Sequence, residues 1–201
     1  MTDSLTEQLT PDLRARAEAY VQWRILRLDG KKTHVNPGQG HLLKNYTNRH
    51  FLQYKNQGAF GGINLGFSDN AEPSTAAKVV HWEFLNRQRT PVKYDEPIAI
   101  RCKSGYLRYG SRDIGINLHW SDGPVYEWRL LGGKPGTPVM TSDWFSIFNT
   151  ACKEPMIRFV RTRGGDIGWP SSETWFQQVK GHAKDAVEKA IREYVKSKTG
   201  G

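Results

Sequence analysis

Two short stretches of the chain combine the residue types that can hold a sugar. Residues 60–70 read FGGINLGFSDN and residues 112–123 read RDIGINLHWSDG, so both contain Gly-Ile-Asn-Leu followed by an aromatic residue, a serine and an aspartate. Amide and carboxylate groups can bind hydroxyl groups, and an aromatic ring can pack on the apolar face of a sugar. The two stretches therefore predict two carbohydrate sites, one with Asn64, Phe67 and Asp69 and the other with Asn117, Trp120 and Asp122.

The same residues also have a purely structural interpretation. In a strand, Ile116 and Leu118 would share an inward face with Trp120, whereas Asn117 would point outward. The shared pattern can then reflect core packing, with the asparagine and the Ser-Asp pair forming turns. Whether these residues are a site or turn residues stays open at this point.

Basic residues offer a competing surface. Lys and Arg number 29 against 20 Asp and Glu, and the formal net charge of +9 favours an acidic partner such as sulfated glycan, nucleic acid or an actin-like protein. The alternative is that the charges only keep a β-rich surface in solution. The basic residues fall in matching segments, where they could form a positive ring that binds a polyanion: Lys44, Arg49, Arg101, Lys103, Arg108, Arg112, Arg158, Arg161 and Arg163.

Patterns that would indicate catalysis are missing from the sequence. The chain has neither a glycine-rich phosphate loop before Lys-Ser or Lys-Thr nor a His-Glu-x-x-His motif. Cys102 and Cys152 lack metal-ligand spacing, so we expect two reduced structural thiols. We therefore expect a non-enzymatic protein without a cofactor or a metal.

The candidate residues lie within three copies of one segment pattern. QWRILRLD, HWEFLNRQ and EWRLLGGK place Trp23, Trp82 and Trp128 at equivalent positions, and each segment is followed by a Thr-x-Val element. HLLKN, IAIRC and FSIFN come next, and then HFLQYK, GYLRYG and PMIRFV. Alternating apolar and polar residues predict half-buried strands for these segments, about four per copy.

The third copy differs from the others at its end. Its last element is DIGWPSSET, and we expect Asp166-Ile167-Gly168 to match Asp113-Ile114-Gly115. Pro170 then replaces the asparagine, and a proline cannot donate to a strand ladder. The third copy is therefore predicted to have lost the pattern of the other two.

This threefold pattern resembles the β-trefoil superfamily, which includes ricin-type lectin domains, fascin and fibroblast growth factors. GYLRYG and EWRLL look like strand signatures of fascin-like and agglutinin-like trefoils, although the ricin-type Gln-x-Trp motif is absent. The resemblance implies a mainly β trefoil over residues 21–170, with imperfect repeats at about 21–78, 79–125 and 126–170. Trefoil lectins repeat a sugar site in each unit, so two intact copies imply two glycan sites.

Both flanks of the repeats are predicted to be helical. In the N-terminal segment 1–20, Thr10 is suited to an N-cap and Pro11 to the first helical position. The C-terminal segment 171–201 has Ser171 or Ser172 as a cap, followed by apolar residues at helical spacing. This stripe consists of Trp175, Phe176, Val179, Ala183, Ala186, Val187, Ala190, Ile191 and Tyr194.

The start of the chain lacks the pattern of a secretion signal, and no apolar run approaches the roughly 18 residues that span a bilayer. We therefore expect no transmembrane insertion. The expected location is cytoplasmic, or outside the cell after export without a Sec signal peptide. The expected partner is a glycan or glycoprotein and, in the alternative, a polyanion.

Overall fold

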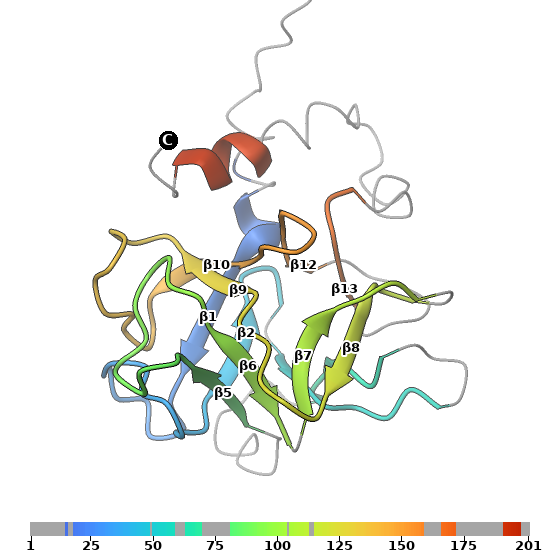
Figure 1. Cartoon of the computed structure of the whole chain (residues 1–201), viewed down its shortest axis with the longest axis horizontal. Coiled ribbons are helices and arrows are strands. Elements are labelled where there is room, and N and C mark those ends of the chain that lie inside the picture. The colour runs from blue at the N-terminus through green and yellow to red at the C-terminus, as the bar shows by residue number, and fades with distance from the viewer. Residues whose placement is uncertain are drawn as a thin grey trace, which may run out of the picture.

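The computed structural model describes residues 15, 18–48, 50–58, 63–69, 81–103, 105–112, 115–158, 166–171 and 191–197. The protein is mainly β, with antiparallel sheets and two helices, as the sequence predicts (Figure 1). Several predicted features lie outside the described residues. They are the polyanion-binding residues Arg49, Arg161 and Arg163, the helix caps at Thr10 and Pro11, and the helical stripe from Trp175 to Ala190.

Each unit begins with a strand that buries a tryptophan. These strands are β1 (Gln22–Leu26), β5 (Trp82–Leu85) and β9 (Trp128–Leu131). Buried and less buried residues alternate in β1 and β5, as expected for strands with one face on the core. Trp23, Trp82 and Trp128 are all 0% exposed, so the prediction that they point inward is confirmed.

The second strands join the units to one another. They are β2 (Leu42–Asn45), β6 (Ala99–Cys102) and β10 (Trp144–Asn149), and each pairs antiparallel with the first strand of its own unit. β10 also pairs with β1, through Phe145 with Trp23. The residues just before β2 and β6 make isolated bridges to the first strand of the next unit, His41 with Trp82 and Ile98 with Trp128. The pairings therefore run from β1 through the three units and return to β1.

Equivalent residues make equivalent hydrogen bonds between the units. The valine amides form a cycle, in which Val35 donates to Val139 at 2.9 Å, Val139 to Val92 at 2.8 Å, and Val92 to Val35 at 2.9 Å. The tryptophan Nε1 atoms also donate to a neighbouring unit. Their acceptors are the carbonyls of Met156 for Trp23 (2.8 Å), Leu52 for Trp82 (2.6 Å) and Leu107 for Trp128 (2.7 Å).

Short outer strands follow the second strand of each unit. In the first two units they are β3 (Phe51–Gln53) with β4 (Gly66–Phe67), and β7 (Gly105–Tyr109) with β8 (Leu118–Ser121). In the third unit they are β11 (Glu154–Pro155), β12 (Ile157–Arg158) and β13 (Ile167–Gly168). Ile63, Leu65, Ile116 and Leu118 are buried, which confirms the inward phase predicted for the two Gly-Ile-Asn-Leu segments.

The register of the third unit corrects the expected alignment. Phe148 pairs with Pro155, and the amide of Met156 donates to the carbonyl of Ile147, so Met156 takes the position that Leu107 has in the second unit. Ile157 pairs with Gly168, which places Trp169 opposite Met156, as Trp120 stands opposite Leu107.

Asp166 therefore matches Asn117, and the expected match of Asp166 to Asp113, with Pro170 at the asparagine position, is wrong. Met156 and Ile157 are both apolar, so alternation alone could not choose between the two registers. The third unit keeps an aromatic residue, Trp169, at the position of Trp120.

One helix precedes the strands in the chain and the other follows them. Residues 18–21 lead directly into β1, and residues 191–197 form the end of the predicted C-terminal helix, with Ile191 and Tyr194 buried. In Figure 1 this C-terminal helix lies above β10 and the turn that leads to β12. Within the described part of the chain, no helix has the length and apolar character needed to cross a membrane.

Candidate functional site

The asparagines of the two repeated stretches hold loops between outer strands. Asn64 Oδ1 accepts a hydrogen bond from the amide of Gln57 at 3.1 Å, and its Nδ2 donates to the Tyr54 hydroxyl at 2.9 Å. Asn117 Oδ1 accepts from the amide of Arg112 at 3.1 Å. The side-chain oxygens of both asparagines, and the amide nitrogen of Asn64, are therefore bonded within the protein, as expected for turn residues.

The aromatic residues of the same stretches pack between units. Trp120 stacks on Trp82 with ring centroids 6.4 Å apart, and it lies 5.9 Å from the ring of Tyr54 in the first unit. Phe67 is partly buried against the core, with the Arg158 guanidinium 5.8 Å from its ring. These rings contribute to packing and offer only part of their surface to a ligand.

The aspartates lie on the surface, away from the asparagines. Asp122 follows the end of β8 whereas Asn117 precedes its start, so the extended strand separates their backbones by about 16 Å. Asp69 is exposed and pairs with Lys55 at 3.1 Å. The structure therefore does not bring Asn117 and Asp122 together around one sugar ring.

Basic residues gather on the outward face of the sheet β5–β8. Arg101 stands opposite Tyr106, and Arg108 stands opposite His119. Because opposite residues and alternate residues of a strand share a face, these four side chains point to the same side. We call Arg101, Tyr106, Arg108 and His119 the basic face.

The charges of the basic face differ in their contacts. Arg101 is held by Glu83 at 2.6 Å and lies 5.9 Å from the Tyr106 ring. Arg108 is exposed and forms no ion pair with any described residue. His119 Nε2 lies 2.8 Å from the carbonyl oxygen of Ser111 and must donate to it, since a carbonyl only accepts.

Two further predicted cations border this face. Lys103 is exposed in the turn between β6 and β7, and its Nζ lies 4.0 Å from the ring of Tyr54. Arg112 lies in the loop before β8 and donates from Nη1 to the Leu118 carbonyl at 3.3 Å. The second unit therefore carries Arg101, Lys103, Arg108 and Arg112 from the predicted polyanion set, with Lys103 and Arg112 beyond opposite ends of β7.

The other described cations of that set belong to other units. Lys44 lies on the first unit, with its Nζ 5.8 Å from the ring of Phe51. Arg158 lies on the third unit, where its Nη1 is 3.5 Å from the Thr47 hydroxyl. The single ring of these charges stays a prediction, because Arg49, Arg161 and Arg163 lie outside the described residues.

The two cysteine thiols are not activated as nucleophiles. Burial raises the pKa of the Cys102 and Cys152 thiols to about 12, so both are uncharged near neutral pH. Both cysteines are free, as predicted. No group of three or more possible metal ligands occurs among the described residues.

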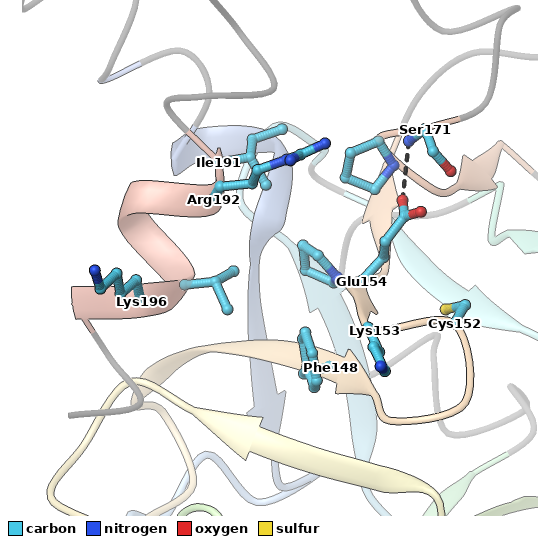
Figure 2. Close-up of a pocket in the computed structure, with 11 residues that line it drawn as sticks. Phe148, Cys152, Lys153, Glu154, Ser171, Ile191, Arg192 and Lys196 are labelled. Atoms are coloured by element: carbon cyan, nitrogen blue, oxygen red, sulfur yellow. Dashed lines mark hydrogen bonds between the residues drawn. The ribbon is translucent and has the colours of Figure 1, made fainter. Parts of the chain in front are cut away.

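A cavity that the sequence reasoning missed lies at the third unit. It has a volume of about 530 Å³ and is lined by residues of β10, β11 and the C-terminal helix, among them Phe148, Pro155 and Ile191 (Figure 2). One signal in the sequence could have revealed it. Phe148 occupies the position that holds Lys44 and Arg101 in the other two copies.

Comparison of the chain with protein-family models, with curated proteins and with solved structures finds no match.

Proposed function

We propose that this protein is a non-enzymatic recognition module with a β-trefoil fold, whose second unit binds polyanions. Three features support the trefoil: the strand pairings that return to β1, the valine cycle, and the tryptophan bonds between units. In each feature, equivalent residues link one unit to the next in the same way, as expected for a fold with pseudo-threefold symmetry.

The basic face supports binding through charge. Arg101 and Arg108 are diagonal neighbours on adjacent strands, so their backbones lie about 7 to 8 Å apart. Their long side chains can contact successive acidic groups of one polyanion, with the Tyr106 ring between them as an apolar surface. Lys103 and Arg112 extend the positive charge beyond the sheet, and Glu83 is the acid that pairs within it.

The proposal rests on the exposed guanidinium of Arg108, which lies beside Arg101 and forms no ion pair with any residue in the described part of the chain. Carbohydrate binding through the repeated stretches has less support, because Asn64 and Asn117 bond within the protein. A neutral glycan therefore enters the test as the competing outcome.

Binding of a heparin oligosaccharide and of oligo(dT) should be measured at about 50 mM and about 200 mM salt. A polyanion held by charge loses affinity steeply as counterions compete. For oligo(dT), each lost phosphate contact should reduce the slope of log K against log salt by about 0.7. The informative variant is Lys103→Asn with Arg108→Ser, which removes two charges at the basic face. Asparagine is chosen at residue 103 because it tolerates the positive φ of 56° there.

The matched control is Lys93→Asn with Lys134→Ser, which removes the same charge from two exposed lysines outside the basic face. The proposal expects weaker binding and a smaller salt slope for the basic-face variant, and near wild-type behaviour for the control. Equal losses in both variants would indicate a diffuse effect of net charge. Salt-insensitive binding of a neutral glycan would favour the carbohydrate alternative instead.

A further inference from the structure

The cavity at the third unit has apolar walls contributed by separate parts of the chain. Phe148 of β10 lies on one side and Ile191 of the C-terminal helix lies on the other (Figure 2). Pro155, which pairs with Phe148, and Val195 of the same helix also line the cavity. The Glu154 carboxylate accepts a hydrogen bond from the amide of Ser171 at 2.9 Å. This bond ties the chain beyond β13 to β11 and fixes one wall.

Comparison of the repeats shows that this part of the third unit has changed in character. At the equivalent place in the first unit Lys44 lies over Phe51, and in the second unit Arg101 lies over Tyr106. The pairing of Phe148 with Pro155 puts these two residues at the same positions. A cation-aromatic pair in the other two units has thus become an apolar pair, on which the cavity lies.

The C-terminal helix covers this apolar pair incompletely. A closely packed helix would leave few voids larger than a water molecule, yet about 530 Å³ remains between the helix and the strands. This volume lies within the range of small-ligand pockets, which is about 300 to 1,000 Å³. A macromolecular partner would instead need a contact area of roughly 800 Å² on this surface.

The lining adds positive charge to the apolar walls. Lys153 and Arg192 border the cavity, and Glu154 is the acid among its lining residues, whereas the ammonium group of Lys196 points away from the cavity (Figure 2). The Cys152 thiol also lines the cavity and is uncharged, because burial raises its pKa to about 12. An apolar body with a negative end fits this combination, whereas a sugar would leave its hydroxyl groups against apolar walls.

We propose that this cavity binds a single-chain amphiphile with one anionic headgroup. The apolar chain lies against Phe148, Pro155 and Val195, and the headgroup meets the cations at the rim. This inference does not depend on the basic face, which belongs to the second unit.

Dodecanoate is a suitable probe, used below its micelle concentration and titrated calorimetrically into the full chain. Dodecan-1-ol tests the need for the charge and butyrate tests the need for the chain. We expect one dodecanoate per protein, bound at least tenfold more tightly than either comparison compound. A dodecanol affinity equal to that of dodecanoate would overturn the proposal, as would the lack of binding at a single site.

Two variants localise the binding. Phe148→Lys introduces the residue type of the first unit and should weaken dodecanoate binding at least tenfold. Leu28→Lys is the matched control, since it makes a similar change at an apolar residue that is already 40% exposed. Its affinity should equal that of the wild type.

Lys153→Asn with Arg192→Gln changes two exposed residues and keeps the test valid if Phe148→Lys does not fold, since asparagine tolerates the positive φ of 60° at residue 153. This variant should weaken dodecanoate binding severalfold and leave dodecanol binding unchanged. Wild-type dodecanoate affinity in this variant would contradict the assigned headgroup position. Wild-type affinity in a folded Phe148→Lys protein would remove the cavity as the site.

Discussion

The interior and the outer faces of the three units differ in how far the copies agree. In the interior, the three tryptophans are all fully buried and all donate to a carbonyl of a neighbouring unit. On the outer faces, one position of the second strand holds Lys44 in the first unit, Arg101 in the second and Phe148 in the third. The interior residues must fit one another across the units, so a change in one copy disturbs the other two. An outward residue has no such partners. The comparison teaches that the repeat is retained where the units pack together and that binding features are to be sought where the copies differ.

The largest expected effect concerns the interior. Trp128→Ala removes a fully buried ring and leaves the Leu107 carbonyl without its donor, so unfolding free energy should fall by about 3 to 5 kcal/mol. Trp82→Ala should cost a similar amount. Urea denaturation measures both, and Leu28→Ala at the surface should stay within about 0.5 kcal/mol of wild type. A loss below about 1 kcal/mol for either tryptophan would show that the interior does not depend on its repeated residues.

The next prediction concerns a position where the interior repeat is itself broken. His41 is 0% exposed, and the equivalent residues of the other units are Ile98 and Phe145. Burial is the main cause that lowers the pKa of His41. The backbone groups of Gln39 and Trp82 oppose this shift, and the positive charge of Arg27 adds a smaller contribution in the same direction as burial.

Since the folded-state pKa of His41 lies below the unfolded value, the unfolded chain binds the proton more readily. Stability should therefore be unaffected by this residue above about pH 6.5 and decrease as the pH falls below it, by at most about 1.4 kcal/mol per pH unit. His41→Leu should remove this part of the acid sensitivity in urea denaturation series at pH values between about 7.5 and 5. An identical pH dependence in wild type and variant would disprove the role of His41.

The smallest expected effect separates turn residues from site residues on the outer face. Asn117→Ala removes the acceptor of the Arg112 amide and should cost about 0.5 to 1.5 kcal/mol of stability. Asp122→Ala changes an exposed residue beyond β8 and should stay within about 0.5 kcal/mol. If Asn117→Ala left stability unchanged but abolished binding of a neutral glycan, the carbohydrate interpretation would replace the turn interpretation.

Much of the interior could be predicted from the sequence. The three Trp strands and the Thr-x-Val elements were recognisable because core packing restricts these positions to large apolar or β-branched residues. The register of β11 and β12 could not be predicted, because Met156 and Ile157 are adjacent apolar residues and either one satisfies the alternation. Only the pairing partners Phe148 and Gly168 distinguish the two registers.

The outer faces were less predictable for a different reason. The sequence contains the residues of the basic face, but the grouping of Arg101 with Arg108 depends on strand register. The cavity forms between the C-terminal helix and Phe148. Local periodicity does not predict which segments far apart in the chain come close together.

The claim that the outer faces carry independent binding features is tested most directly by one cross-comparison. Heparin oligosaccharide and dodecanoate are each titrated into wild type, into Lys103→Asn with Arg108→Ser, and into Phe148→Lys. The account predicts that the basic-face variant loses affinity for heparin alone and that the cavity variant loses affinity for dodecanoate alone. Parallel losses of both ligands in either folded variant, or no loss in both, would contradict it.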